Sequence, residues 1–315
     1  MESTRSNQIS QGDRSSGSSL SGPSNQSRCL ACPRYCRVDR KAGEKGFCGA
    51  GSVPEVSMAD LHMWEEPPIS GTNGSGTVFF IHCNLRCVFC QNHVISQGDD
   101  GPEMPVEKLA DTFLSLQRRR AHNINLVSPT HYSFEIAQAL REAKDRGLRI
   151  PVVYNSNGYD SPETLSAMDG LVDVYLPDLK YFDDTLAVKY SAAPKYFQHA
   201  SRAILEMSRQ VGGPVFDANG MVTRGLIVRH LVLPGHAEDS IRLLKWFKES
   251  LPKGTYLSLM SQYYPTHRAQ EFPEINRRLR RAEYDRVVDA LYALGLEDGF
   301  VQELSSADSR YTPKF

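Results

Sequence analysis

Short apolar segments rich in β-branched residues alternate with helical patterns along the chain beyond residue 76. The strand candidates lie at 77–81, 123–127, 150–154, 172–176, 225–233 and 255–260. Between them, apolar residues recur every three or four positions, as they do from Val106 to Leu114, and this spacing predicts amphipathic helices. Because each parallel strand needs a crossover to return to the same edge, the alternation predicts a parallel α/β sheet.

The number of strand–helix units limits the architecture. Six units are two fewer than a closed eight-stranded barrel requires, so we expect a partial (β/α)6 barrel, to which 299–304 adds a short extra strand. Ser133 is the expected N-cap of one helix, Ser161 opens another, and Gly147 and Pro194 mark interruptions. Chemistry in such folds lies beyond the carboxyl ends of the strands, where we therefore expect the site.

Composition divides the chain into four segments. Residues 1–28 are rich in Ser, Gly, Gln and Asn and almost free of large apolar residues, so we expect a disordered tail. Residues 29–70 hold a cysteine-rich module and a connector that contains the sequence WEEPP. The barrel is expected at 71–305, and 306–315 form a C-terminal tail.

Charge and hydropathy narrow the range of partners. The chain has 36 Lys and Arg residues against 37 Asp and Glu residues, and this balance gives no bulk electrostatic reason to bind nucleic acid or anionic lipid. No apolar run approaches the roughly 18 residues of a membrane span, and the N-terminus lacks the apolar core of a secretory signal. We therefore expect a cytoplasmic protein with neither a membrane nor a nucleic acid as partner.

Three cysteines follow the first predicted strand directly. Cys83, Cys87 and Cys90 have the spacing C-x3-C-x2-C, which suits a soft metal or an iron–sulfur cluster. In a [4Fe–4S] cluster, three thiolates leave one iron without a protein ligand, and an open position is a chemical site. The alternatives are a zinc site completed by His82 or His93, and an electron-transfer cluster with a distant fourth ligand.

The remaining cysteines form a second group near the N-terminus. Cys29, Cys32, Cys36 and Cys48 have the spacing C-x2-C-x3-C-x11-C, so all seven cysteines fall into two groups. An odd number of cysteines without a secretory signal argues against disulfides. Four thiolates can close a tetrahedral zinc site or bind a complete second cluster, and the spacing does not separate these two. The alternative is four free cysteines.

The cysteine motif and its surroundings resemble a known superfamily. C-x3-C-x2-C with an aromatic residue before the third cysteine, after the first strand of a partial barrel, resembles the radical S-adenosylmethionine (SAM) superfamily. The stretch WEEPPISGTNGSGTVFFIHCNLRCVFCQNHVIS, with CLACPRYC and GEKGFCGAG before it, is similar to proteins related to pyruvate formate-lyase activating enzyme. This resemblance spans 29 to about 304.

Polar residues after the later strands are the candidate SAM contacts. Asp178-Leu179-Lys180 matches the Asp-Leu-Lys of the activating enzymes, although an ion pair between the two charged residues is the structural alternative. The third strand ends in Asn-Ser-Asn-Gly where those enzymes have Asp-Thr-Asn-Gly, and the second lacks their Gly-Gly-Glu type motif. The full set of candidates is Ser128, Thr130, Asn155, Asn157, Asp178, Lys180, Arg229 and Gln262.

The resemblance implies a reaction and its partners. It implies an enzyme that cleaves SAM reductively to methionine and a 5′-deoxyadenosyl radical, served by an electron donor such as flavodoxin or ferredoxin. It also implies activation of a partner protein by forming a glycyl radical. The alternatives are radical modification of another protein, RNA or small molecule, and a non-enzymatic electron-transfer or metal-binding protein.

Overall fold

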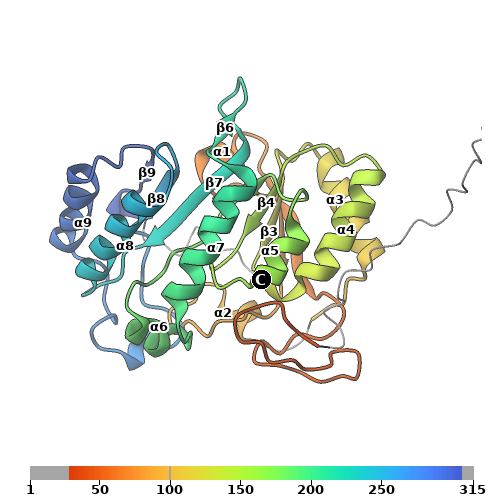
Figure 1. The fold of residues 1–315 in the computed structure, drawn as a ribbon, viewed down its shortest axis with the longest axis horizontal. Helices are drawn as coiled ribbons and strands as arrows, with labels where there is room; N and C mark the ends of the chain where they lie inside the picture. The colour runs from red at the N-terminus through yellow and green to blue at the C-terminus, as the bar shows by residue number, and fades with distance from the viewer. Residues whose placement is uncertain (1–27, 99–100, 307–315) are drawn as a thin grey trace, which may run out of the picture.

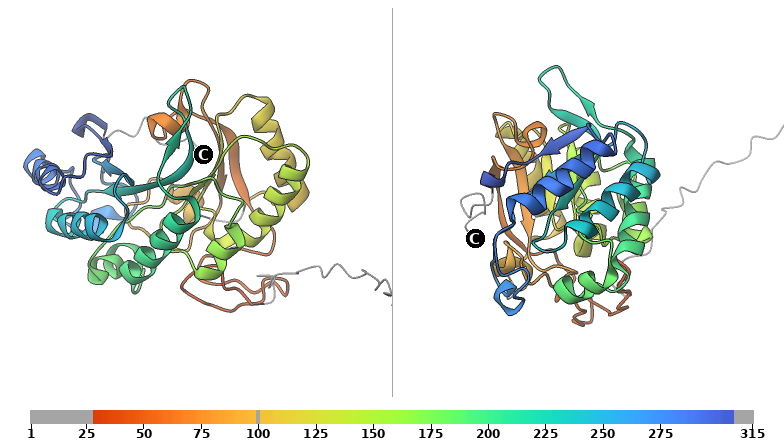
Figure 2. Two further views of the ribbon diagram at one scale, coloured as in Figure 1. Left: turned by 45° about the horizontal axis from the view of Figure 1, so that its top comes forward. Right: turned by 90° about the vertical axis from the view of Figure 1, so that its left-hand side faces the viewer.

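Parallel strands form the inner layer of the fold, and helices cover their outer face (Figures 1 and 2). The computed structural model describes residues 28–98 and 101–306. The tails expected at 1–28 and 306–315 lie outside this description, apart from Arg28 and Ser306. The strands are β1 (Val56–His62), β2 (Ser75–Phe80), β3 (Ile124–Val127), β4 (Val152–Asn155), β5 (Val174–Tyr175), β6 (Val215–Phe216), β7 (Val222–Leu231), β8 (Tyr256–Met260) and β9 (Gly299–Val301).

The helices differ in length and place: the longer ones follow the predicted alternation and cover the sheet, and two four-residue helices lie at its edges (Figure 1). In chain order, the helices are α1 (Pro67–Ser70), α2 (His93–Ser96), α3 (Val106–Arg118), α4 (Ser133–Asp145), α5 (Pro162–Met168), α6 (Asp184–Ser191), α7 (Tyr196–Val211), α8 (Ala237–Ser250) and α9 (Arg281–Ala293), with 3-10 turns at Thr130–Tyr132, Ala269–Glu271 and Leu304–Ser306. The longer helices bury one apolar face each, as Leu109, Phe113 and Leu116 do on α3. This packing explains why the periodicity of three to four residues was informative.

The predicted partial (β/α)6 barrel is confirmed. Strands β2, β3, β4, β5, β7 and β8 are parallel neighbours in that order, with Gly76 opposite Ile124 and Ile124 opposite Val152. Their carboxyl ends meet at one edge, the lower edge in Figure 1, where α2 lies. The hairpin of β6 and β7 projects from the opposite edge. Side chains that follow different strands therefore converge at a single rim.

The sheet extends beyond the six predicted strands at both sides. The segment treated as a connector contains β1, which pairs antiparallel with β2 and so belongs to the sheet. Its polar Asp60 and His62 obscured the strand in the sequence, because pairing with the edge of β2 decided its conformation. At the other side, β9 pairs with β8 inside the expected 299–304 segment.

Helix boundaries differ from expectation at one cap. Helix α4 begins at Ser133 and its cap residue is Tyr132, so the expected N-cap role of Ser133 was wrong. The Ser133 hydroxyl instead pairs with the Thr164 hydroxyl at 2.9 Å, because α5 packs beside α4. Ser161 does cap α5 by accepting a hydrogen bond from the Thr164 amide. The break near Pro194 is present between α6 and α7.

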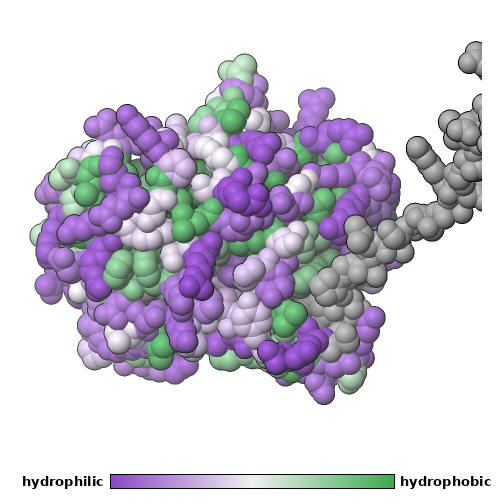
Figure 3. All heavy atoms as spheres, in the orientation of Figure 1, coloured by the Kyte–Doolittle hydropathy of each residue, from purple (hydrophilic) through white to green (hydrophobic). Residues whose placement is uncertain are grey.

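The core lies between the strands and the helices, and the outer surface is mixed. On the face seen in Figure 3, hydrophobic residues are scattered among hydrophilic ones. Within the ranges that the structure describes, no helix combines the length and apolar character needed to cross a bilayer. The interior holds many tyrosines, among them Tyr154, Tyr159 and Tyr196, whose rings pack while their hydroxyls find polar partners.

Gly158 generates the first prediction, because it combines a positive φ of +77° with a close backbone approach. A Cβ added there would lie 2.4 Å from the Asp178 carbonyl oxygen. We expect Gly158→Ala to lower the free energy of unfolding by roughly 1–2 kcal/mol for the left-handed conformation. The overlap with backbone should add about 1–3 kcal/mol.

The matched control is Gly170→Ala, where φ is +73° but the space around the added Cβ is open within 4 Å. Urea denaturation of both variants at neutral pH measures the difference. Equal destabilisation of the two variants would contradict the close approach of the loop after β4 to the loop after β5.

Candidate active site

The loop that follows β2 lies at the carboxyl edge of the sheet, next to α2 (Figure 1). It carries three cysteines, the cysteine triplet: Cys83, Cys87 and Cys90. The loop is held by backbone hydrogen bonds, since the Arg86 amide donates to the Ser191 carbonyl at 3.0 Å and the Val88 amide donates to the Tyr190 carbonyl at 2.8 Å. These bonds attach the triplet to the C-terminal end of α6, which is far away in the sequence.

The three thiols lie close enough to influence one another. Burial, with the charges of Cys87 and Cys83 added, raises the pKa of Cys90 to about 12. Burial and the charge of Cys87 raise the pKa of Cys83 to about 11. Grouped thiols of this kind keep their protons at neutral pH until a metal displaces them and supplies the compensating positive charge.

The positions of the possible ligands argue against a single metal ion but are compatible with a four-iron cluster. In the part of the chain that the structure describes, no three His, Cys, Asp or Glu side chains surround a point suited to one metal ion. A four-iron cluster binds each thiolate through a different iron, so its ligand sulfurs are spread more widely. The two histidines considered as zinc ligands have other contacts: His82 bonds Glu55 at 3.3 Å, and His93 stacks on His267 with ring centroids 4.6 Å apart.

Opposite the triplet, charged and amide side chains that lie on or follow several strands form a partly buried ion network. Arg229 on β7 donates from Nε to Asp178 Oδ1 at 2.9 Å and from Nη2 to Asn155 Oδ1 at 2.6 Å. Its Nη1 lies 3.3 Å from Glu65 Oε2. Lys180 Nζ donates to Asp178 Oδ2 at 2.6 Å. The ion pair between Asp178 and Lys180 is therefore real, and it is one part of a larger network.

Mutual pairing controls the protonation of this ion network. Burial by itself would raise the pKa of Asp178, but the charges of Arg229 and Lys180 outweigh burial and hold that pKa below its ordinary value. Burial likewise opposes the charge of Lys180, whose pKa is nevertheless raised by Asp178. For Glu65, burial wins over Arg229 and raises the pKa. Two cations and an ionised aspartate thus face the cavity at neutral pH.

A cavity of about 250 Å³ lies between the cysteine triplet and the ion network. Aromatic side chains, among them Trp64, Phe79 and Tyr264, form part of its wall. All three triplet cysteines line this cavity, together with every expected SAM contact except Thr130: Ser128, Asn155, Asn157, Asp178, Lys180, Arg229 and Gln262.

Thr130 occupies a different place. Its side chain is buried, and its hydroxyl donates to Asp160 Oδ1 at 2.7 Å within a cluster that also includes Tyr154 and Ser156. Asn157 does line the cavity, but its amide donates to Asn84 Oδ1 at 2.7 Å and to the sulfur of Cys83 at 3.4 Å.

The sequence analysis missed Glu65 as a site residue. It precedes α1 and reaches the interior of the barrel, where Asn125 donates to its Oε1 at 3.0 Å. The WEEPP sequence could have indicated this role. It contains two adjacent glutamates and no basic residue to pair with them, so their partners must come from elsewhere in the chain. Glu66 is also buried, and its Oε2 has no hydrogen-bond partner.

The second cysteine group lies together in the N-terminal module. We call Cys29, Cys32, Cys36 and Cys48 the N-terminal cysteine group. Burial, followed by the charges of the other three thiols, raises the pKa of Cys32 to about 12. Arg40 is buried beside them, donates from Nη2 to the sulfur of Cys48 at 3.5 Å, and leaves Nε without a partner. A buried guanidinium next to four thiols suits a centre whose ligands carry negative charge.

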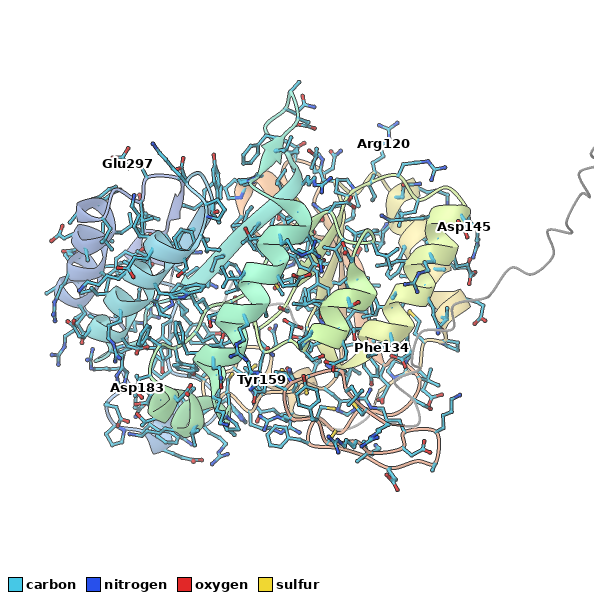
Figure 4. All side chains as sticks on the ribbon, viewed as in Figure 1. Arg120, Phe134, Asp145, Tyr159, Asp183 and Glu297 are labelled. Carbon is cyan, nitrogen blue, oxygen red and sulfur yellow. The ribbon has the colours of Figure 1, made fainter. Side chains whose placement is uncertain are left out.

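The N-terminal module packs directly on the loop of the cysteine triplet. Arg34 donates from Nε to the Asn84 carbonyl at 2.7 Å and from Nη2 to the Ala192 carbonyl at 2.6 Å. Its guanidinium also lies 3.3 Å from the centre of the Phe47 ring. Tyr159, labelled in Figure 4, lies at this boundary, and its carbonyl accepts from the Asn84 amide at 2.7 Å.

Comparisons with known proteins agree with this arrangement. The model of the radical SAM superfamily matches residues 77–260. The uncharacterized protein MJ0674 of Methanocaldococcus jannaschii is 30% identical over 269 residues, covering 83% of this chain and 73% of its own. The uncharacterized protein MJ0808 of the same organism is 24% identical over 277 residues, covering 79% of this chain and 74% of its own.

Solved structures show the same fold at low sequence identity. Streptococcus suis SuiB bound to precursor peptide SuiA has a TM-score of 0.51 and 14% identity, and the match covers 72% of this chain and 48% of SuiB. SuiB bound to S-adenosylmethionine has a TM-score of 0.50 and 15% identity, covering 72% and 50%. This chain thus matches about half the length of SuiB. Because the superfamily model covers more than half of the chain, the protein belongs to the radical SAM superfamily.

Proposed function

We propose that this protein is a radical SAM enzyme whose cysteine triplet binds a [4Fe–4S] cluster and whose ion network binds SAM beside it. The observation that carries the proposal is the shared cavity. Three sulfurs line one side of it, and Asp178, Lys180 and Arg229 line the other. The superfamily implies both a [4Fe–4S] cluster and SAM, so the two groups need adjoining sites of this kind.

The residues of the cavity fit these groups. Cys83, Cys87 and Cys90 would hold three irons of a [4Fe–4S] cluster and would leave the fourth iron open to SAM. When bound, the reduced cluster supplies the electron that cleaves SAM to methionine and a 5′-deoxyadenosyl radical. The protein contributes position and shielding, because Leu85, Phe89 and Tyr263 bury the loop against the core and limit the access of water.

The ion network supplies contacts for a zwitterionic and cationic cofactor. Lys180 and Arg229 offer positive charge to the SAM carboxylate, and ionised Asp178 offers negative charge to its sulfonium and amino groups. Asn155 and Ser128 add uncharged hydrogen-bonding groups at the ends of β4 and β3. Tyr264 and Phe79 provide aromatic surface for the adenine. Thr130 is not part of this proposal, because Asp160 already engages its hydroxyl.

We propose that the hydrogen donor is a partner protein and that the outcome resembles glycyl-radical activation. The support is the match of Asp178-Leu179-Lys180 to the activating enzymes, together with the similarity of the WEEPP and cysteine segments to proteins related to those enzymes. The electron comes from a small redox protein such as flavodoxin or ferredoxin.

We further propose that the N-terminal cysteine group holds a second metal centre in its own module. The support is that the charges of the other three thiols act on Cys32 and that Arg40 is buried beside them, so the group offers four thiols as ligands, although no three of them surround a point suited to one metal ion in the described structure. Because Arg34 from this module bonds the Asn84 carbonyl next to Cys83, the centre also stabilises the loop of the cysteine triplet.

The second prediction tests the cysteine triplet. Anaerobically reconstituted, reduced protein should convert SAM slowly to methionine and 5′-deoxyadenosine in the absence of substrate. Cys83→Ala, Cys87→Ala and Cys90→Ala should each abolish this turnover, because a lost thiolate removes a cluster ligand. Chromatography of the products measures the rate, and Val94→Ala, an exposed position nearby, should keep the wild-type rate.

Electron paramagnetic resonance separates the enzyme from an electron carrier. In the wild-type protein, the signal of the reduced cluster should shift when SAM is added. A reducible cluster whose signal ignores SAM would identify an electron carrier instead. Retained SAM cleavage in any one of the three cysteine variants would show that this loop does not bind the cluster.

The third prediction concerns the metal content of the N-terminal cysteine group. Fully loaded wild-type protein should contain about four irons and one zinc, or about eight irons and no zinc. Combined replacement of Cys29 and Cys32 by Ala should remove one centre and leave the SAM-responsive signal of the triplet. Elemental analysis of both proteins decides. About four irons and no zinc in the wild type would refute a second centre.

A further inference from the structure

Each sulfur of the cysteine triplet lies within hydrogen-bond distance of a polar side chain from a different segment. Asn157, after β4, donates from Nδ2 to the sulfur of Cys83 at 3.4 Å. Ser191, at the end of α6, donates from its hydroxyl to the sulfur of Cys87 at 3.0 Å. The Ser96 hydroxyl, at the end of α2, lies 3.2 Å from the sulfur of Cys90. We call these three residues the sulfur donors.

The chemistry of a ligated sulfur determines the direction of these bonds. A thiolate bound to iron has no proton, so it can only accept a hydrogen bond. The contact between Ser96 and Cys90, which either atom could donate in the free protein, must then run from the hydroxyl to the sulfur. The same holds for Ser191 and Cys87.

The sulfur donors are held in place by their own partners. The Asn157 amide is oriented because its Oδ1 accepts from the Tyr159 amide at 3.0 Å while its Nδ2 donates to Asn84 at 2.7 Å. The Tyr181 hydroxyl lies 2.7 Å from the Ser191 hydroxyl. Because Ser191 uses its proton for the sulfur of Cys87, Tyr181 must donate to Ser191. Tyr181 is 1% exposed, so water does not compete for the hydrogen bonds that link Tyr181, Ser191 and Cys87.

Hydrogen bonds to cluster sulfurs affect the two oxidation states unequally. Reduction adds an electron to a centre that is already negative, and part of this charge resides on the sulfurs. A donor aimed at a sulfur stabilises the more negative state and so raises the reduction potential.

We propose that Asn157, Ser191 and Ser96 are positioning residues that act through the three sulfurs to set the reduction potential of the cluster. This inference rests on the proposed cluster site. It gives Asn157 a role at the sulfur of Cys83 in place of the expected contact with SAM. It also explains why polar side chains from three separate segments, rather than apolar ones, are directed at the loop.

The test is a redox titration of the anaerobically reconstituted protein, followed by electron paramagnetic resonance. Ser191→Ala removes the donor to Cys87. At a fixed potential we expect the ratio of reduced to oxidised cluster to fall about tenfold, a shift of about 59 mV to lower potential for one electron. Ser191→Thr keeps the hydroxyl and should restore most of the shift. Tyr181→Phe should shift the potential in the same direction by less, since Ser191 is then less polarised.

The matched control is Ser75→Ala. Ser75 is fully buried and bonds Asn123 Oδ1 at 2.6 Å, but it lies at the start of β2, away from the cysteines. Its loss should leave the potential unchanged. Ser96→Ala and Asn157→Leu test the other two sulfurs independently if Ser191→Ala does not fold.

The outcomes separate this inference from the proposed function. A wild-type protein without a reducible, SAM-responsive cluster would overturn both at once, before any variant is made. The wild-type cluster could respond to SAM as expected while Ser191→Ala, Ser96→Ala and Asn157→Leu leave its potential unchanged. This result would overturn the proposed role of the sulfur donors alone. A lowered potential with rescue by Ser191→Thr supports them, because a merely structural role would not return with the hydroxyl.

Discussion

A single arginine, whose side chain is only 15% exposed, ties the inner wall of this barrel together. Arg229 on β7 contacts Asp178 after β5, Asn155 at the end of β4 and Glu65 from the segment after β1. A guanidinium removed from water costs several kcal/mol unless anions and hydrogen-bond acceptors replace its hydration. The three acceptors come from separate segments, so the arginine can be satisfied only when all of them are in register. The polarity of the cavity is thus tied to the correct assembly of the sheet.

The opposite wall of the cavity carries thiols in place of ion pairs. The cysteine triplet lies in a loop where burial raises the pKa of Cys83 and Cys90, so the proposed cluster would supply the positive charge that balances their thiolates. Around the sulfurs, Asn157, Ser191 and Ser96 offer hydrogen bonds that become one-directional once the sulfurs are thiolates. The site therefore holds two compensated sets of charges, one built from ion pairs and one prepared for a metal.

The N-terminal module joins these parts from outside the barrel. Arg34 donates hydrogen bonds to carbonyls in the triplet loop and after α6. At the start of α5, the hydroxyls of Ser161 and Thr164 donate to the carbonyls of Leu30 and Ala31. Arg40 reaches the His131 carbonyl, close to the end of β3, at 2.5 Å. The segment that carries the N-terminal cysteine group is thereby packed on the loop that carries the triplet.

The sequence by itself determined the class of the fold and predicted which edge of the sheet carries the candidate site. Alternating strand and helix periodicity requires a parallel sheet, and Cys83, Cys87 and Cys90 follow the first of its strands, so both conclusions depend only on local pattern. The residues after the later strands could be chosen for the same reason, since parallel strands end at a common rim.

Only the tertiary structure decided which polar groups face one another. Strand β1 and Glu65 were hidden in an apparent connector, because pairing with β2 and burial against Arg229 involve partners distant in the chain. Thr130 was a plausible cavity residue in sequence, yet Asp160 holds its hydroxyl elsewhere. A strand pattern specifies that a side chain lies near the rim, but its hydrogen-bond partner depends on the three-dimensional approach of other segments, which one sequence does not encode locally.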